Sequence, residues 1–386
     1  MKKLFLYIIF FFIAFACKEK FNTDLHSPST GYLVVEGFIG SGNDPTAISL
    51  SRSVKLVDSV NIIYETNASV TVEGENNETF PLNENINGSY TSAGSLNLNA
   101  NEKYRIHIIT RNNKEYISDF ESVKHTPPID SITFQRENGG LRIFIDTHDA
   151  QNNTRYYKWN YEETWEIRSS FLSNLKYIRD PATNMIEKVD YRYPLTQAPD
   201  TTIYRCWVSN SSKSTNIGSS EKLTADVIHQ PLNYIEHAAE KLSVLYSIKI
   251  KQYALSHEAY LFFEKIKKNT EQLGSIFDAQ PSELKGNIHC VSDPKEPVIG
   301  FIGVSEEMNM RIFIRNNEVP GWGYNPFCSE IIIDNNADSI MKYGLSLTPT
   351  TPSKTMNLQI IQFGAASPSC VDCTLKGTNV RPSFWP

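Results

Sequence analysis

Two cysteines near the C-terminus have a spacing that serves three different chemistries. The segment Cys370-Val371-Asp372-Cys373 could bind zinc, act as a redox couple or supply structural disulfides. A structural zinc site usually needs two such pairs, and the sequence contains one. A redox pair of this spacing begins a helix, whereas Pro368-Ser369 and Gly377 around the segment are typical of a loop. The choice depends on the compartment in which the protein folds.

The N-terminal residues have the parts of an export signal. Lys2 and Lys3 precede an apolar run of 13 residues, from Leu4 to Ala16. This run is too short to cross about 30 Å of hydrocarbon as a helix, but it is typical of a signal peptide. The small residue Ala16 directly precedes Cys17, an arrangement that resembles a bacterial lipobox, although Phe15 is bulkier than usual there.

In a lipobox the cysteine thiol receives a diacylglycerol, the leader is removed, and the cysteine becomes an acylated, often palmitate-bearing, N-terminus. We therefore predict a signal peptide over residues 1–16, lipidation of Cys17 and a flexible polar tether over residues 17–30. Because each buried methylene contributes about 0.8 kcal/mol, three acyl chains would make a nearly permanent membrane anchor. The alternative is a plain secretory signal in which Cys17 is incidental.

An exported protein folds under oxidising conditions, which favours disulfides over zinc and redox chemistry at the C-terminal pair. Five cysteines remain after Cys17. Because five is an odd number, at least one of them must be unpaired. They are Cys206, Cys290, Cys328, Cys370 and Cys373.

The composition excludes some functions. The chain has 386 residues, of which 40% are hydrophobic, so it can bury real cores. Its 37 basic and 43 acidic residues give a net charge of −6, and without a basic excess we expect no nucleic-acid partner. The sequence contains no G-x-S-x-G, H-E-x-x-H, phosphate-loop or G-x-G-x-x-G motif. We therefore assign no catalytic residue, metal site or cofactor.

Short β-prone runs separated by turn signals predict a mainly β protein. Residues 31–126 contain six such runs and are expected to form a β-sandwich. Their VVEG, ASVTVEG and NGSY segments resemble Ig-like, transthyretin-like domains, whose role is scaffolding or docking. Thr126-Pro127-Pro128 should end this domain, because two prolines remove backbone donors and fix φ.

Residues 127–386 are expected to form a larger β-rich domain with one clear helix near residues 256–269. Ser256 is the predicted N-cap, and Ala259, Phe263 and Ile266 make an apolar stripe along the helix. A dense aromatic run occupies the first long strand of this domain. We expect it to form one buried core face, and a surface for carbohydrate or peptide is the alternative. Its members include Tyr156, Tyr157, Trp159, Tyr161 and Trp165.

The whole chain resembles a known family. Segments that carry the resemblance are YRCW at Tyr204–Trp207 and the strings GSIFDAQPSELKGNIHC, VIGFIGVSEEMNMRIFI and CVDCTLKGTNVRPSFWP. They are similar to the Bacteroidota outer-membrane lipoproteins of domain of unknown function 4249. That family has no established catalytic residues, and its members are typically found with TonB-dependent transporters of the SusC type.

The resemblance implies a non-enzymatic, lipid-anchored protein exposed on the outer membrane. It would associate with a SusC-type TonB-dependent transporter and assist cargo capture or gating. The alternatives are a surface hydrolase acting on glycan or peptide, and a structural or adhesive surface protein. A convergent acid and base in a cleft would favour the hydrolase.

Two further expectations follow from resemblance. Cys290 stands where the family leads us to expect a polar residue such as Asn, which makes it the candidate free thiol. The other four cysteines, Cys206, Cys328, Cys370 and Cys373, can then pair in three ways. Three Asp-Ser-apolar triplets also resemble the O-glycosylation sequon of the same phylum, with candidate sites at Ser59, Ser131 and Ser339.

Overall fold

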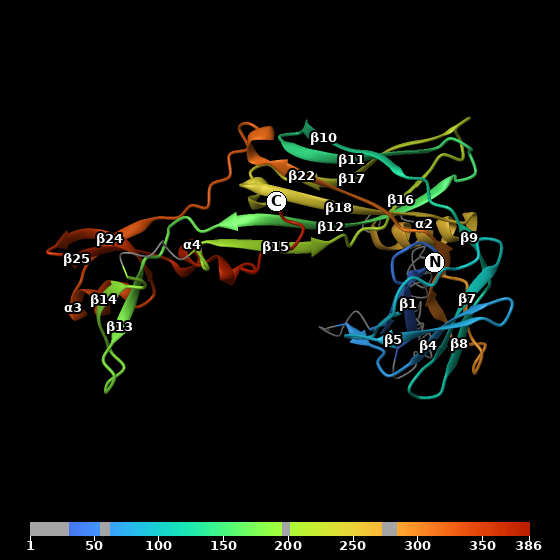
Figure 1. Ribbon diagram of the computed structural model, residues 1–386, viewed down its shortest axis with the longest axis horizontal. Coiled ribbons are helices and arrows are strands. Elements are labelled where there is room, and N and C mark those ends of the chain that lie inside the picture. Colours follow the sequence, from blue (N-terminus) through green and yellow to red (C-terminus); the bar gives the residue numbers. More distant parts are fainter. Residues whose placement is uncertain (1–30, 55–61, 195–200, 272–283) are drawn as a thin grey trace, which may run out of the picture.

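The computed structural model describes residues 31–54, 62–194, 201–271 and 284–386. The chain forms three β bodies: an N-terminal barrel, a central sandwich and a distal module. Figure 1 shows the barrel beneath one end of the sandwich and the distal module beyond its other end. The N-terminal body is thus a closed barrel and not the predicted β-sandwich. Cys17, Ser59, the signal peptide (1–16) and the tether (17–30) lie outside the described residues. The mainly β fold class predicted from the sequence is confirmed.

The N-terminal barrel is a ring of eight strands. Strand β9 closes the ring because it pairs with both β21 and β7. Alternating apolar residues such as Val70 and Val72, or Ile106 and Ile108, point into its core, as a half-buried strand requires. In ring order the strands are β7 (Lys103–Ile109), β4 (Ser69–Gly74), β5 (Thr79–Glu84), β6 (Ser89–Thr91), β2 (Ala47–Arg52), β1 (Leu33–Gly40), β21 (Gly303–Ser305) and β9 (Glu121–Lys124).

Part of this barrel comes from the second half of the chain. Strand β21 pairs in parallel with β1, and the buried side chains of Ile302 and Val304 belong to the barrel core. The predicted boundary at Thr126-Pro127-Pro128 does separate β9 from β10. However, the division into residues 31–126 and 127–386 misses three strands that return to the barrel. They are β19 (Ile288–Cys290), paired with β8 (Glu115–Ser118), β20 (Val298–Gly300), paired with β1, and β21.

The central sandwich packs two antiparallel sheets face to face around one core. One sheet has the order β10 (Ile129–Glu137), β11 (Gly140–Asp149) and β17 (Asp226–Ile235). The other has the order β15 (Arg205–Ser211), β12 (Tyr156–Arg168), β18 (Leu245–Ala254) and β22 (Met308–Arg315), with β16 (Asn216–Ser219) also on β12.

Helix α2 (His257–Glu271) is the predicted helix and lies where the barrel meets the sandwich (Figure 1). The Ser256 hydroxyl accepts the Ala259 N–H at 3.2 Å, which confirms the predicted N-cap. Its apolar side packs in one cluster with Phe38 of β1 and Tyr253 of β18. The helix therefore fills the junction between the two bodies.

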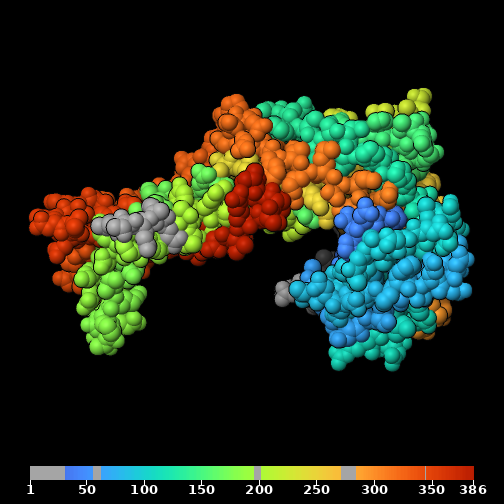
Figure 2. Space-filling view, in the orientation of Figure 1, coloured from blue at the N-terminus to red at the C-terminus, as the bar shows by residue number. Residues whose placement is uncertain are grey.

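The distal module consists of a hairpin and a three-stranded sheet that share a small core. The hairpin pairs β13 (Leu175–Arg179) with β14 (Ile186–Tyr191), and the sheet has the order β23 (Glu330–Asp334), β25 (Gln359–Ala366) and β24 (Thr348–Met356). Figure 2 shows the resulting shape, an arch with the barrel at one end and this module at the other.

Candidate functional site

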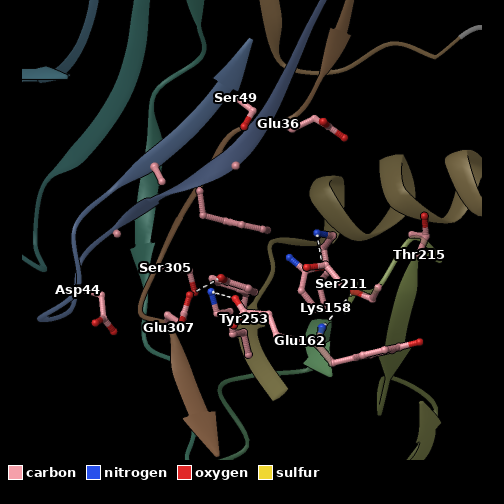
Figure 3. Close-up of a pocket in the computed structure, with 18 of the residues that line it drawn as sticks. Glu36, Asp44, Ser49, Lys158, Glu162, Ser211, Thr215, Tyr253, Ser305 and Glu307 are labelled. Atoms are coloured by element: carbon pink, nitrogen blue, oxygen red, sulfur yellow. Dashed lines mark hydrogen bonds and ion pairs between the residues drawn. The ribbon is translucent and has the colours of Figure 1, made fainter. Parts of the chain in front are cut away.

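A cleft of about 810 Å³ lies where the barrel, the central sandwich and α2 meet. Figure 3 shows Glu36 and Ser49 on the barrel side and Lys158 and Glu162 on the β12 side. Sites of this size, placed between two bodies, are typical of small-molecule binding. The lining also includes Phe38 and Asp44 from the barrel, Lys249, Lys251 and Tyr253 from β18, Phe263 and Ile266 from α2, and Glu307.

Three aromatic rings hold the two sides of the cleft together. The rings of Phe38 and Tyr253 stack with centroids 4.5 Å apart and planes 7° apart. The Phe263 ring lies 6.3 Å from that of Phe38. Because these residues come from β1, β18 and α2, their contact fixes the barrel against the sandwich and gives the cleft an apolar wall.

Lys158 on β12 is the unusual charge in this cleft. Its Nζ lies 5.3 Å from the centroid of the Phe38 ring and 4.8 Å from that of Phe263. Its hydrogen bond goes to the neutral Asn160 Oδ1 at 3.2 Å. Burial lowers the pKa of Lys158 to about 8, and the negative charge of Glu36 opposes that shift only in part.

Two other charged groups of the cleft, Lys251 and Glu307, already have hydrogen-bonding partners. Lys251 Nζ forms an ion pair with Glu162 Oε1 at 2.8 Å. Burial would lower the pKa of Lys251, but its hydrogen bond to Glu162 and the negative charges of Glu307, Glu162 and Asp44 together outweigh burial and raise it. On the other side, the Tyr253 hydroxyl donates to Glu307 Oε2 at 2.5 Å, and burial together with the Glu307 charge raises the pKa of Tyr253. The cleft thus presents charges of both signs and an aromatic wall to a ligand.

The four cysteines predicted to form disulfides are paired. Cys206 bonds to Cys373, with Cα atoms 5.7 Å apart, and Cys328 bonds to Cys370, with Cα atoms 5.8 Å apart. The two cysteines of the C-terminal pair are therefore bonded to different partners and not to each other. Cys290 is the free cysteine, as expected; it is buried in the barrel core, and burial raises the pKa of its thiol.

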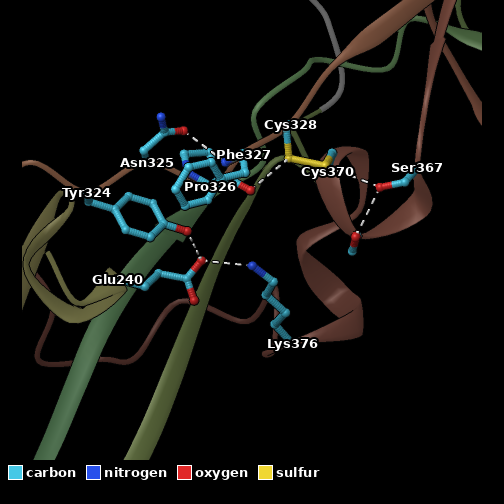
Figure 4. The surroundings of a disulfide bond; sticks show 10 residues. Glu240, Tyr324, Asn325, Pro326, Phe327, Cys328, Ser367, Cys370 and Lys376 are labelled. Carbon is cyan, nitrogen blue, oxygen red and sulfur yellow. Dashed lines mark hydrogen bonds and ion pairs between the residues drawn. A yellow bond between two sulfur atoms is a disulfide. The ribbon is translucent and has the colours of Figure 1, made fainter.

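The disulfides attach the C-terminal segment to the rest of the molecule. Cys328–Cys370 joins the segment before β23 to α4 (Pro368–Val371), and beside it Glu240 accepts hydrogen bonds from Tyr324 and Lys376 (Figure 4). Cys206–Cys373 bonds the same segment to β15. The chain then returns to the central sandwich, where the Trp385 ring packs edge-on against that of Trp207, 6.4 Å away.

The structure places Ser131 and Ser339 away from the cleft, whereas Tyr161 of the predicted aromatic run lines it. Ser131 lies on β10 and donates a hydrogen bond to Asp146 Oδ2 at 2.8 Å. Ser339 lies in α3 (Ala337–Ser339), where its backbone N–H donates to Asn336 Oδ1. In the aromatic run, Tyr157 and Trp159 are fully buried in the sandwich core, which confirms the core interpretation for these two.

Large apolar side chains remain exposed on the distal module. Isolated exposed apolar residues are ordinary, but a concentration of them marks a surface that contacts another protein or a membrane. Ile331 and Ile332 on β23 are 44% and 52% exposed, and Leu358 at the β24–β25 turn is 80% exposed. The others are Met185, Phe327, Met341, Tyr343, Leu345 and Met356.

Neither the cleft nor the exposed apolar surface of the distal module was predicted from the sequence. Lys158 alternates with buried aromatic residues, so the strand pattern indicates only an outward-facing lysine. Its surroundings come from Phe38 and Phe263, which are far away in sequence. The exposed isoleucines of β23 look like core residues when they are read as a strand.

Within the described ranges, no set of three or more His, Cys, Asp and Glu side chains is placed to bind a metal ion. No helix in the same ranges has the length and apolar character needed to span a bilayer.

The chain matches no curated protein. The family model for domain of unknown function 4249 matches residues 18–311, well over half of the sequence, from the tether to β22. The chain therefore belongs to the family described as domain of unknown function 4249.

Proposed function

We propose that this protein is a lipid-anchored binding protein of the outer membrane that acts with a SusC-type TonB-dependent transporter and assists cargo capture or gating. The leader and Cys17 support the anchor. The transporter partner is what the resemblance to this family implies, and the chain belongs to the family. Anchoring both proteins in one membrane raises their effective concentration, so a modest interface can stay occupied.

The observation that carries the proposal is the exposed apolar surface of the distal module. Its side chains on β23 and at the β24–β25 turn lose contact with water only when another surface covers them. The module stands at the end of the arch opposite the barrel (Figure 2), so a partner can reach it without displacing either larger body. We therefore place the transporter contact on this module.

Co-purification tests this proposal. The native protein, solubilised from outer membrane in mild detergent and captured by antibody, should bring down a TonB-dependent barrel. The double variant Ile331→Lys/Ile332→Lys should lose most of that barrel. The two side chains point to opposite faces of the sheet, so whichever face the transporter covers would bury a lysine charge without a partner, which is costly.

Ile62→Lys/Ile63→Lys is the matched control. These consecutive residues are 65% and 49% exposed at β3 (Ile63–Tyr64), which pairs with β2 of the N-terminal barrel, so this variant adds the same two charges to another exposed apolar site and should retain the transporter. If the native protein runs alone, the proposal fails. If it also cleaves glycans or peptides, and the activity is lost with one acidic residue or His, the hydrolase interpretation replaces it.

A further inference from the structure

The Lys158 ammonium has no carboxylate partner in the described parts of the chain. Its contacts are one neutral amide oxygen, Asn160 Oδ1, and the faces of two aromatic rings, Phe38 and Phe263. An ammonium group has three N–H donors, and burying it without an anion is costly. Such an arrangement persists at a cost in stability, and an anion from outside would relieve that cost.

Lys158 also lines the cleft, so an anion can reach it (Figure 3). Lys251 on the neighbouring strand makes the contrast clear. It lines the same cleft and carries the same charge, but Glu162 neutralises it at 2.8 Å. Lys213 and Lys249 line the cleft as well, but of its four lysines Lys158 is the one whose ammonium lies over two aromatic rings, with a neutral amide oxygen as its hydrogen-bond partner.

We propose that the cleft between the barrel and the central sandwich binds a ligand through a carboxylate, which pairs with the Lys158 ammonium beside the rings of Phe38 and Phe263. This inference rests on the cargo-capture part of the proposed function and specifies the chemistry of the cargo. The ligand carboxylate would form a charge-assisted hydrogen bond with Nζ, the strong kind in a site shielded from water.

The other lining groups favour a carboxylate over a phosphate. Glu36, Asp44 and Glu307 also line the cleft, and their negative charges disfavour a dianion more than a monoanion. The same carboxylates can accept hydrogen bonds from hydroxyl or ammonium groups elsewhere on the ligand. The cleft therefore suits a molecule with one carboxylate and several donors, and its volume of about 810 Å³ admits a short peptide or a disaccharide.

Peptides and acidic sugars both have this chemistry, so the test uses a matched pair from each class. The probes are trialanine and its C-terminal amide, and galacturonic acid and neutral galactose, so that each acidic probe has one carboxylate. Binding is measured by calorimetry with the full chain in detergent. In at least one pair the carboxylate form should bind about tenfold or more tightly than its neutral counterpart.

Variants then assign the charge. Lys158→Met should weaken binding of the carboxylate probe about tenfold or more, whereas Lys158→Arg, which keeps the charge, should retain most of it. Lys354→Met removes the same charge from an exposed position on β24, outside the cleft, and should change affinity by less than about threefold. Thermal melting of each variant separates a loss of binding from a loss of folding.

The pH dependence gives an independent measure. Since burial holds the pKa of Lys158 near 8, the affinity of the wild type should fall as the pH rises through that value and the ammonium loses its proton. Lys158→Met should lack this decline. The other titratable groups that line the cleft are Glu36 on β1, Asp44 in the loop after it, Tyr161 and Glu162 on β12, Lys213 after β15, Lys249, Lys251 and Tyr253 on β18, and Glu307.

The inference is overturned if no carboxylate probe binds the wild type, or if Lys158→Met binds as well as the wild type. These experiments contain no transporter, so they are independent of the co-purification test. Loss of ligand binding with the transporter retained would refute the carboxylate site alone. Ligand binding by a protein that never co-purifies with a barrel would refute the transporter partnership alone.

Discussion

At the scale of single residues, Lys158 contrasts with a buried charge that has partners within the protein. Glu166 on β12 is 1% exposed and belongs to the first kind. Its carboxylate accepts hydrogen bonds from Arg205 Nη2 at 2.7 Å and Arg168 Nε at 2.9 Å. Burial would raise the pKa of Glu166, but these two hydrogen bonds outweigh burial and lower it.

Glu166→Gln should therefore destabilise the protein by about 2 kcal/mol at pH 7, less than for a fully buried pair because both arginines can turn to solvent. A carboxylate with a lowered folded-state pKa stabilises the fold above its unfolded pKa, and this stabilisation is lost as the pH falls through the folded pKa. Urea unfolding should show the difference from wild type shrinking below a pH of about 4.3. A difference independent of pH would contradict this account.

The cysteines give a second prediction at this scale. A digest made without reductant should contain two linked peptide pairs, one joining Cys206 to Cys373 and the other Cys328 to Cys370. Cys290 should react with an alkylating reagent only after denaturation, because it is buried and its thiol pKa is raised. A peptide closed by a Cys370–Cys373 bond would show that the pairing described above is wrong.

At the scale of elements, strands with a regular apolar alternation were predictable and strands that break the pattern were not. β7 and β18 follow the alternation, and both were expected. β17 contains Pro231 and β24 contains Pro349 and Pro352, which read as breaks because proline cannot donate to a strand ladder. Each of these strands lies at an edge of its sheet, where a missing donor is tolerated.

Pairing partners were the other part that the sequence did not reveal. Residues 288–305 fall within the predicted second domain, 127–386. No local feature of their sequence indicates that they are strands of the barrel. The cleft was not predictable for the same reason, because its residues come from elements that are far apart in the sequence. Its wall joins Phe38, Tyr253 and Phe263, which only the packing of three elements brings together.

The return of β19, β20 and β21 to the barrel can be tested with a fragment. Residues 31–126 alone lack β21, which lies between β1 and β9 in the ring. We expect this fragment to be unfolded or aggregated, because its core side chains on β1 would stay exposed and its sheet edges unpaired. Joining residues 285–307 to it through a flexible linker should restore cooperative thermal unfolding, measured by circular dichroism. Cooperative unfolding of the shorter fragment would contradict the prediction.

At the scale of the whole molecule, the predicted lipid anchor at Cys17 would restrict where the protein acts. Cys17→Ser should abolish incorporation of radiolabelled palmitate and release the protein from the membrane, because no acyl chain would remain to hold it. Membrane fractionation of the two forms measures this directly. Continued labelling, or retention in the membrane fraction, would rule out lipidation at Cys17.

The return of β19, β20 and β21 to the barrel also has a consequence for biogenesis. A chain that emerges N-terminus first presents β1 and β9 long before residue 305 is available to bridge them. Until β21 is synthesised, the edges of β1 and β9 remain unpaired while the central sandwich is still being made. Unpaired strand edges promote aggregation. A chaperone that covers such edges should therefore bind the nascent chain during this interval. A substitution that slows folding of the sandwich should prolong this binding, although it lies outside the barrel.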